Sequence, residues 1–333
     1  MLASIATGWI ALAPCVAAAL DLQGHRGARG LAPENTLEGF AEALSIGVST
    51  LEMDLGVTAD GVVVVAHDPH LHPDLTRWPD GAWLEEPGPA LHDLPLAELQ
   101  RFDIGRMRPG SRYAQRFPEQ QPADGARLPT LAEVVALTRR AGNDAVRFNL
   151  ETKLSPLAPD LTPSPEAFAE AVVAVVEAEG IGARTTIQSF DWRSLRAVHA
   201  LAPHLATACL TVEEAWEDNV RRGQAGPSPW TAGLDVDDFG GDVPALVDAA
   251  GCAVWSPYFE DLTPEALARA HDLGLEVIVW TVNRPDDMAA LIEMGVDGII
   301  TDYPDRLRPV MAARSLPLPE PTPVGPRDRL DGR

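Results

Sequence analysis

Short apolar runs alternate with amphipathic segments along the chain from residue 21 onward. The apolar runs have the length of β-strands, and they predict strands at residues 20–25, 50–57, 62–68, 145–151, 185–190, 205–212, 253–258, 276–282 and 298–303. Between them, apolar residues recur at intervals of three and four, and several segments end at a glycine, as helices commonly do. This spacing predicts helices at residues 36–47, 130–142, 164–180, 191–203, 263–274 and 284–295.

The order of these elements selects a fold class. Strands that alternate with helices build a parallel sheet. About eight such units in roughly 290 residues fit a closed barrel better than an open, doubly wound sheet. The GxGxxG and GKS/T motifs of nucleotide-binding sheets do not follow the first strand. We therefore predict an α/β protein, a (β/α)8 TIM barrel that spans residues 21–315.

Three segments break the alternation, and one of them is an irregular stretch at residues 218–243. Residues 69–127 are rich in proline, glycine, tryptophan and arginine, and they are too long for an ordinary loop. They predict an inserted cap segment after the second strand region, folded over one end of the barrel. Residues 316–333 are rich in proline and predict a disordered tail.

The first 20 residues are apolar, rich in small side chains, and end in alanines. This pattern predicts a secretory signal peptide, and with it a periplasmic or secreted protein. The segment lacks the basic residues that usually begin a signal peptide, so a cytoplasmic protein with a misassigned start is the alternative. The run is too short and too soon interrupted to predict a stable membrane span in the mature protein.

Charge and cysteine content narrow the choice of partners. The chain of 333 residues carries 26 basic and 49 acidic side chains, a net charge of −23, which disfavours nucleic acid and anionic membranes as partners. An anionic substrate would therefore need local positive charge.

The three cysteines, Cys15, Cys209 and Cys252, lack metal-ligand spacing. Cys209 and Cys252 lie in apolar runs and are interpreted as small buried hydrophobes, although a disulfide between them is possible. The oligomeric state stays open.

Polar side chains collect where the predicted strands end. In a TIM barrel these carboxyl ends surround one mouth, where the active sites of the fold lie. Glu52 and Asp54 are two positions apart and so share one face of their strand. The candidates, in chain order, are His25, Arg26, Asn35, Glu52, Asp54, His67, Glu151, Lys153, Gln188, Trp280 and Asp302.

Lys153 is the only lysine of the chain, and it follows Glu151 by two positions, so the two side chains share a face. Alone, the pair could be a structural ion pair. Glu52, Asp54 and Glu151 together form an all-oxygen set, which suits Mg²⁺ or Ca²⁺ better than zinc.

The charges of this cluster also indicate a divalent cation. Three carboxylates with Arg26 and Lys153 sum to −1, which repels a phosphate, whereas one divalent cation changes the sum to +1 and attracts it. His25 and His67 have ordinary pKa values near neutrality and are natural candidates for a general acid and a general base.

The motifs HRGARGLAPENT, EMD, TADGVVVVAHD, LPTLAEV, FNLETK, QSF, WTVN and GVDGIITDYPD resemble the glycerophosphodiester phosphodiesterase family over roughly residues 21–312. The resemblance implies a metal-dependent barrel enzyme that cleaves glycerophosphodiesters to glycerol 3-phosphate and an alcohol. It implies that Glu52, Asp54 and Glu151 bind one divalent cation, that His25 and His67 are the acid–base pair, and that Arg26 and Lys153 contact phosphate.

By the same resemblance, the neighbouring glycerol hydroxyl attacks phosphorus and a cyclic phosphate is then hydrolysed. His25 is assigned as the base and His67 as the acid of the first step, and the cap covers the glycerol end of the substrate. A lysophospholipase D-like phosphodiesterase is the first alternative. A non-catalytic phosphate-ester binding barrel is the second, but such a protein should have lost a histidine or a metal carboxylate, and here all are present.

The remaining candidates have two interpretations each. Asn35 could cap the following helix or bond within the active site, and Trp280 could be packing at the barrel mouth or a wall of the substrate site. Asp302 is expected to orient neighbouring groups by hydrogen bonds, and Gln188 either supports the site residues or forms part of the substrate wall. His70 and His72 are interpreted as residues of a solvated loop because further zinc ligands at useful spacing are missing.

Overall fold

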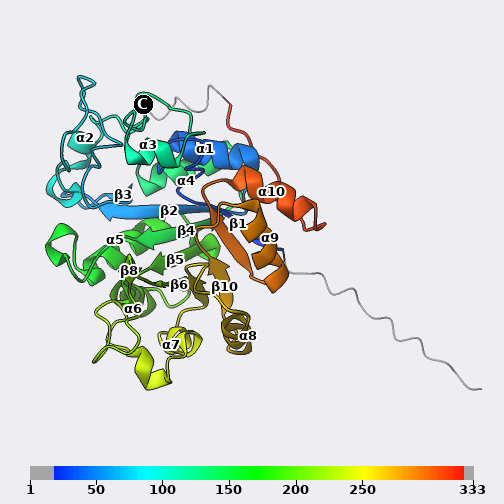
Figure 1. The fold of residues 1–333 in the computed structure, drawn as a ribbon. Coiled ribbons are helices and arrows are strands. Elements are labelled where there is room, and N and C mark those ends of the chain that lie inside the picture. The colour runs from blue at the N-terminus through cyan, green and yellow to red at the C-terminus, as the bar shows by residue number, and fades with distance from the viewer. Residues whose placement is uncertain (1–18, 326–333) are drawn as a thin grey trace, which may run out of the picture.

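The computed structural model describes residues 19–325, and within them eight parallel strands close into a barrel (Figure 1). The strand order is β1-β11-β10-β9-β6-β5-β4-β2, and pairing of β1 with β2 closes the ring, while β3 pairs antiparallel with β2. The barrel strands and β3 are β1 (Asp21–Gly24), β2 (Thr50–Val57), β3 (Val63–Val65), β4 (Arg147–Thr152), β5 (Thr185–Ser189), β6 (Ala206–Thr211), β9 (Val254–Pro257), β10 (Glu276–Val279) and β11 (Gly298–Thr301). The predicted TIM barrel is confirmed.

Helices follow the barrel strands and cover them on the outside (Figure 1). These are α1 (Leu37–Ile46), α4 (Leu131–Arg140), α5 (Pro165–Ala178), α6 (Trp192–Leu201), α7 (Val243–Ala249), α8 (Pro264–Asp272), α9 (Pro285–Met294) and α10 (Pro304–Ala312). Short 3-10 helices lie at η1 (Leu91–Asp93), η2 (Pro159–Leu161), η3 (Gly182–Arg184) and η4 (Val236–Phe239). A two-stranded hairpin, β7 (Glu213–Glu214) and β8 (Glu217–Asp218), follows β6.

The strands are buried on both faces, and their alternation separates two environments. In β2 every residue is buried, and Leu51, Met53 and Leu55 belong to the main hydrophobic core, which also contains residues of the outer helices. Glu52 and Asp54 point the other way, into the barrel, because successive side chains of a strand face opposite sides. Fully burying a leucine-sized side chain stabilises a fold by about 1.5–3 kcal/mol, so the apolar positions fix which face of β2 turns inward.

The interior of the barrel has an apolar part and a polar part. Ala208, Val254, Ile278 and Ile300 form a small cluster on β6, β9, β10 and β11, with Trp280 packed against it. The buried amide and carboxylate side chains of the strands come from the other side of the ring, namely Gln23, Glu52, Asp54, Asn149, Glu151 and Gln188. The polar residues are therefore concentrated on β1, β2, β4 and β5.

The segment predicted to form a cap lies between β3 and α4 and contains α2 (Leu96–Leu99) and α3 (Arg112–Arg116). It has its own hydrophobic cluster, in which Leu71, Leu84, Leu91, Leu99 and Phe102 pack with Val64 of β3. In Figure 1 the cap forms the cyan lobe beside β2 and β3. The apolar contact with Val64 fixes the cap to the strand that leads to His67.

The expectation of a disordered tail from residue 316 is corrected for residues 316–325. The Thr322 amide donates to the Leu44 carbonyl, and Arg308 donates to the Pro319 carbonyl. Val324 is 3% exposed and belongs to the main core. Proline lowers the entropy that is lost when a chain is ordered, so a proline-rich segment can be held by few contacts. Residues 326–333, and nearly all of the predicted signal peptide, lie outside the described residues.

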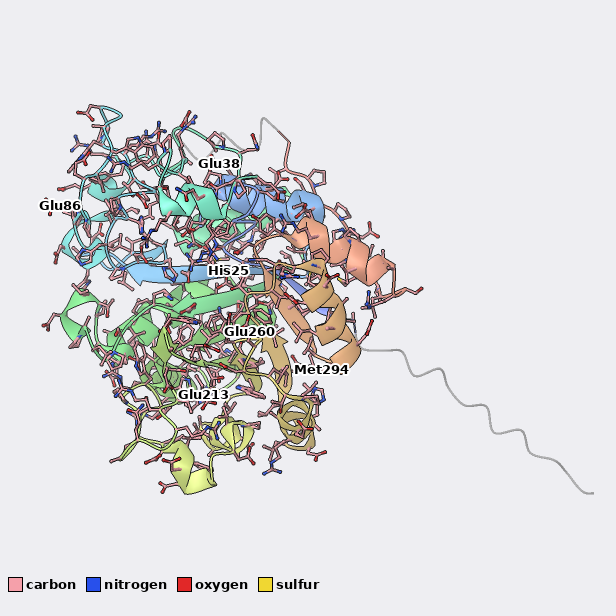
Figure 2. The ribbon with its side chains drawn as sticks, in the orientation of Figure 1. His25, Glu38, Glu86, Glu213, Glu260 and Met294 are labelled. Atoms are coloured by element: carbon pink, nitrogen blue, oxygen red, sulfur yellow. A yellow bond between two sulfur atoms is a disulfide. The ribbon has the colours of Figure 1, made fainter. Side chains whose placement is uncertain are left out.

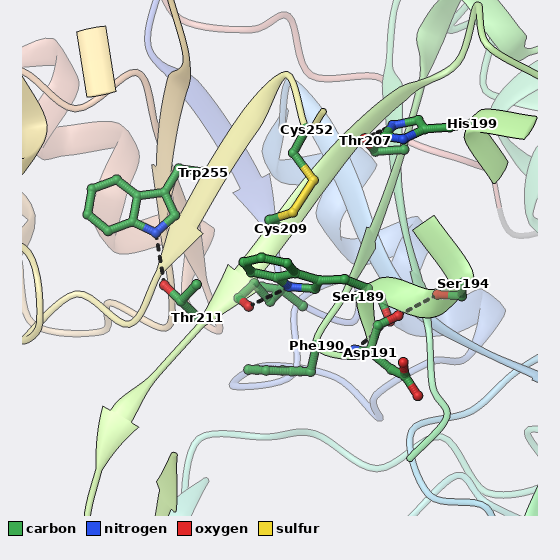
Figure 3. The surroundings of a disulfide bond; sticks show 12 residues. Ser189, Phe190, Asp191, Ser194, His199, Thr207, Cys209, Thr211, Cys252 and Trp255 are labelled. Atoms are coloured by element: carbon green, nitrogen blue, oxygen red, sulfur yellow. Dashed lines mark hydrogen bonds between the residues drawn. A yellow bond between two sulfur atoms is a disulfide. The ribbon is translucent and has the colours of Figure 1, made fainter. Parts of the chain in front are cut away.

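Cys209 and Cys252 form a disulfide, so the interpretation of both as free buried hydrophobes is wrong (Figure 3). Cys209 lies on β6 and Cys252 just before β9, two neighbouring strands of the barrel. Parallel pairing of β6 with β9 brings the Cα atoms of the two cysteines to 5.9 Å, a normal distance for a disulfide.

Across residues 19–325, we find no helix whose length and apolar character would let it span a membrane.

Candidate active site

Three carboxylates meet at the mouth of the barrel, on two neighbouring strands. Asp54 of β2 is in register with Glu151 of β4, and Glu52 lies two positions before Asp54 on the same face. One oxygen from each of the three side chains lies within 4.8 Å of the others. All three are buried, so the barrel holds like charges together where water cannot screen them.

Hydrogen bonds fix two of these carboxylates. Glu52 Oε2 accepts from the Arg26 backbone amide at 2.8 Å, and its Oε1 accepts from Gln188 Nε2 at 2.9 Å. Asp54 Oδ2 accepts from Asn35 Nδ2 at 2.9 Å and lies 3.0 Å from Arg26 Nε. Their orientation is therefore set before any ligand binds.

The pKa values in the cluster move in opposite directions. Burial, with the charges of Asp54 and Glu151, raises the pKa of Glu52 well above its usual range. Burial also raises the pKa of Glu151, to about 7, although the Lys153 ammonium opposes the shift. Burial alone would raise the pKa of Asp54, but the charges of Arg26, His67 and Lys153 hold it well below its usual range. The cluster thus has more carboxylate charge than its neighbouring cations neutralise.

The donor set fits a hard divalent cation. Asp54 Oδ1 is buried and without a hydrogen-bond partner among the described residues, and Lys153 Nζ lies 3.9 Å from it. A buried carboxylate oxygen that lacks a partner costs about 1–3 kcal/mol or more. Three carboxylates at this spacing can supply the oxygen ligands of Mg²⁺ or Ca²⁺, and one of their oxygens is left free of protein donors.

His25 is held by a buried carboxylate. Its Nδ1 lies 2.6 Å from Asp302 Oδ1, and Asp302 also accepts from Arg29 Nε at 2.8 Å and from Asn283 Nδ2 at 2.7 Å. Burial alone would raise the pKa of Asp302, but Arg29 and His25 hold it well below its usual range. An ionised carboxylate only accepts hydrogen bonds, so His25 carries its proton on Nδ1 and leaves Nε2 unprotonated.

The charge state of His25 follows from its surroundings. Burial, and then the positive charge of Arg29, lowers the pKa of His25 to about 4, although Asp302 opposes the shift. The imidazole is therefore neutral at pH 7. Its Nε2 lies 3.9 Å from Glu52 Oε2, beside the carboxylate cluster. Figure 2 shows His25 in the interior, whereas Glu38 and Glu86 lie at the periphery.

His67 also bonds to a carboxylate through Nδ1, but its side chain is more exposed than that of His25. Its Nδ1 lies 2.6 Å from Asp68 Oδ1, and its side chain keeps 34% of its exposure. Burial, with the charges of Arg26 and Lys153, lowers the pKa of His67 to about 3. A nearby anion would oppose this effect, because it favours the protonated imidazole. Both histidines line the same cavity.

The two candidate phosphate ligands are also brought together. Lys153 Nζ donates to Glu151 Oε1 at 2.8 Å, and Arg26 donates from NH1 to Glu34 Oε1 at 2.8 Å. Arg26 has φ 51°, and the following Gly27 has φ 88°. A Cβ at Gly27 would lie 2.7 Å from the backbone of Gly39, so only glycine allows this turn to place Arg26 over the carboxylates.

These side chains line a cavity of about 430 Å³, a volume within the range of small-molecule sites. The cavity includes His25, Arg26, Glu52, His67, Glu151, Lys153, Gln188 and Trp280. It also includes Phe190, Trp216, Glu217 and Trp230, which the sequence analysis did not single out. Trp216 and Glu217 lie on an irregular hairpin, where no periodic pattern marks the inward side.

The structure distinguishes between the alternatives for the remaining candidates. Thr36, not Asn35, caps α1, because the Thr36 side chain accepts from the Gly39 amide, while Asn35 bonds to Asp54. Gln188 and Asp302 orient Glu52 and His25 by hydrogen bonds. Trp280 both packs on the inner cluster and lines the cavity. Arg29 was missed, although its place four residues after His25 is a signal that a turn could bring it back to the site.

The chemistry of this mouth defines a class of protein. Hydrolysis of a phosphate ester requires fixed charges that hold the anion and groups that exchange protons with the attacking and leaving oxygens. Arg26 and Lys153 place positive charge on the cavity lining, and the neutral imidazoles of His25 and His67 line the same cavity and are able to exchange protons. The fold and the site are those of a barrel hydrolase that acts on phosphate esters.

Comparison with known proteins identifies the family. The model of the glycerophosphoryl diester phosphodiesterase family matches residues 25–306. The chain is 30% identical over 284 residues to a glycerophosphodiester phosphodiesterase of Caldanaerobacter subterraneus subsp. tengcongensis, covering 85% of this chain and 94% of that one. It is 29% identical over 290 residues to a glycerophosphodiester phosphodiesterase of Bacillus subtilis, covering 84% and 83%. The chain belongs to the glycerophosphoryl diester phosphodiesterase family.

Solved structures agree with this assignment. A crystal structure from Silicibacter pomeroyi DSS-3, assigned to the glycerophosphoryl diester phosphodiesterases, has a TM-score of 0.79 at 37% identity and covers 90% of this chain and 95% of that one. A phosphodiesterase of Oleispira antarctica has a TM-score of 0.63 at 22% identity, with coverage of 88% and 97%, a likeness that shows the fold. The protein is thus an enzyme, a phosphoric diester hydrolase with glycerophosphodiester phosphodiesterase activity.

Proposed function

We propose that the enzyme hydrolyses glycerophosphodiesters to glycerol 3-phosphate and an alcohol, and that it depends on one divalent cation, Mg²⁺ or Ca²⁺. The observation that carries the proposal is the buried set Glu52, Asp54 and Glu151, whose Asp54 Oδ1 lacks a hydrogen-bond partner among the described residues. In the Oleispira antarctica relative, sn-glycerol-3-phosphate is bound as the product, which supports the same product here.

Glu52, Asp54 and Glu151 would hold the cation, with Asn35 and Gln188 orienting the first two. A bound divalent cation supplies positive charge that draws electrons from a phosphoryl oxygen. Arg26 and Lys153 would bind the phosphate from the protein side. Lys153 is a compact charge that also offsets Glu151, which explains a lysine here in a chain whose other basic side chains are arginine.

His25 is the base of the first step because it is neutral at pH 7 and its Nε2 carries no proton. It takes the proton of the glycerol hydroxyl next to the ester, whose oxygen forms a bond to phosphorus. The bond from phosphorus to the leaving alcohol breaks, and protonated His67 donates its proton to the departing oxygen. The product is a cyclic phosphate, and the bound phosphate anion raises the pKa of His67 so that it can hold this proton.

The second step reverses these roles. His67, now neutral, takes a proton from a water molecule, whose oxygen forms a bond to phosphorus. The ring bond to the glycerol oxygen breaks, and His25 returns its proton to that oxygen. Each histidine is then in its starting protonation state, as a catalytic cycle requires.

We also propose that the enzyme works in the periplasm or outside the cell. The disulfide between Cys209 and Cys252 supports this location, because such bonds persist in oxidising compartments and are rare in the cytosol. The apolar segment at residues 1–20 agrees with export. Separating periplasmic and cytoplasmic fractions of expressing cells tests the location, and full activity in the cytoplasmic fraction alone would reject it.

Product analysis tests the proposed reaction. Purified enzyme is incubated with glycerophosphocholine or lysophosphatidylcholine, with and without EDTA, and Mg²⁺ or Ca²⁺ is added back. Release of glycerol 3-phosphate that stops in EDTA and returns with one cation supports the proposal. Equal turnover in excess EDTA rejects the metal site, and faster turnover of the lysolipid indicates a lysophospholipase D-like enzyme instead.

A further inference from the structure

One side of the cavity is formed by aromatic rings at fixed angles. Phe190 and Trp280 meet edge to face with centroids 5.2 Å apart, and Trp216 meets Trp280 at 6.5 Å and 86°. The Trp280 indole donates to the Ser256 carbonyl at 2.9 Å, which fixes its ring. We call Phe190, Trp216, Trp280 and the adjacent Glu217 the acidic aromatic wall.

Glu217 gives this wall a negative charge. It lines the cavity beside Trp216, at the start of β8. Within residues 19–325, its carboxylate takes part in none of the observed ion pairs or side-chain hydrogen bonds. The Lys153 ammonium, which bonds to Glu151, lies 5.6 Å from the centre of the Phe190 ring, so the faces of Trp216 and Trp280 are the ones left for a ligand cation. A carboxylate of this kind beside π faces attracts an organic cation.

Two further arginines line the same cavity. They are Arg29, which bonds to Asp302 behind His25, and Arg116 of α3 in the cap. In Figure 1 the cap with α2 and α3 lies on one side of β2 and β4, and β8 lies on the other. The anion-binding residues Arg26 and Lys153 lie in the same cavity, so a bound molecule meets positive charge around its phosphate and negative charge at the wall.

We propose that the acidic aromatic wall binds the alcohol part of the substrate, and that it selects alcohols with a quaternary ammonium group. The inference rests on the proposed function and specifies the substrate class of the same site. Aromatic faces bind such cations because their methyl groups cannot donate hydrogen bonds and are weakly hydrated, whereas the π faces offer negative potential. An uncharged acyl chain would pack favourably on the rings, but it would leave the Glu217 carboxylate buried against hydrocarbon, which is costly. The wall therefore favours an alcohol that carries a cation.

Two substrates of equal shape test the proposal. Glycerophosphocholine and the ester of glycerol phosphate with 3,3-dimethylbutanol differ only in the charged nitrogen, which is carbon in the second. We expect kcat/KM to be higher for the choline ester by about fivefold or more, the size of one cation–π contact at a partly exposed site. A ratio near one, or a preference for the neutral ester, overturns the proposal.

Three variants show whether the wall causes this ratio. Glu217→Gln removes the charge, and Trp216→Leu keeps an apolar side chain without a π face; Trp216 is 59% exposed, so the change leaves the core intact. We expect each of these two changes to move the ratio of the two kcat/KM values toward one. Glu214→Gln, on the same hairpin but outside the cavity lining, removes the same charge and should keep the wild-type ratio.

The outcomes separate this inference from the proposed function. Hydrolysis of both esters at equal rates, or a ratio that Glu217→Gln leaves unchanged, overturns the inference while the proposed reaction stands. Failure of the wild-type enzyme to release glycerol 3-phosphate from either ester, with Mg²⁺ or Ca²⁺ present, overturns the proposed function itself.

Discussion

Asp54 and Glu151 are register partners on the adjacent parallel strands β2 and β4, although the whole cap segment separates them along the chain. Both point into the barrel, and Glu52 joins them from the same face of β2. Parallel pairing is what converts two distant acidic motifs into one cluster. The carboxylates repel one another in the metal-free protein, and this repulsion makes the cluster sensitive to cations and to pH.

Replacing a carboxylate of the cluster should strongly weaken metal binding. We expect Glu151→Gln to lower metal affinity by about 100-fold or more, because a neutral amide is a poor ligand. Even the replacement of a residue that only bonds to a metal ligand lowers metal affinity by about 10–100-fold. Isothermal titration calorimetry with Mg²⁺ and Ca²⁺ measures the change. Glu86→Gln, an equal change on the exposed surface of the cap, is the control. Wild-type affinity in Glu151→Gln would contradict the assignment.

Metal affinity should fall as the pH is lowered through about 7. Burial raises the pKa of Glu151 to about 7 in the metal-free protein, and a protonated carboxyl must lose its proton before it binds a cation. Each proton released per ion means about a tenfold loss of affinity for each pH unit below the pKa of its carboxyl, and Glu52, whose pKa is also raised, can add to the loss. Calorimetry at several pH values, in buffers of different ionisation enthalpy, counts the protons.

The same carboxyl should make the metal-free protein less stable as the pH rises. The pKa of Glu151 is raised from 4.5 to about 7 on folding, so the folded state binds the proton more tightly than the unfolded state. The stabilisation is complete below pH 4.5 and is lost as the pH rises through 7. Urea denaturation in EDTA shows this trend, and Glu151→Gln should weaken it.

Both histidines should be needed for turnover. We expect His25→Ala or His67→Ala to lower kcat by about 100-fold or more, as expected when a general acid or base is removed. Steady-state rates with glycerophosphocholine measure the loss. His204→Ala, at an exposed histidine on the outside of the barrel, is the control. A near-normal rate in either active-site variant would remove that histidine from the mechanism.

Asp302 should act through His25. In Asp302→Asn, the amide can donate to Nδ1 and so favour the tautomer that protonates Nε2, the wrong nitrogen for a base. We expect kcat to fall by about 100-fold, with KM nearly unchanged, because Asp302 bonds to His25, Arg29 and Asn283 behind the site. Rates across a pH range, with NMR of the His25 ring nitrogens, detect the altered tautomer. An unchanged ring spectrum would contradict this role.

The disulfide should stabilise the fold. It closes a loop of 43 residues between Cys209 and Cys252, and cross-links of this kind typically contribute about 2–4 kcal/mol. Guanidinium denaturation with and without dithiothreitol should show lower stability under reduction. Cys209→Ala/Cys252→Ala should match the reduced wild-type protein and show no response to dithiothreitol.

The sequence alone determined the barrel, because the patterns that predict its strands and helices are local. A strand such as residues 50–57 and a helix such as 164–180 are identified by the spacing of their own apolar residues. The candidate site also followed, since every parallel strand of a closed barrel ends at the same mouth. The acidic and histidine residues that several of these strands carry at their ends therefore predict one cluster without any knowledge of distances.

The tertiary structure decided what depends on contacts between distant segments. Parallel pairing of β6 with β9 brings Cys209 to Cys252, and a hairpin without periodic pattern brings Trp216 and Glu217 to the cavity. Contacts with Leu44 and the core likewise order residues 316–325 in spite of their composition. Composition and periodicity describe a segment by itself, whereas its partners are set by the free energy of the whole packed chain.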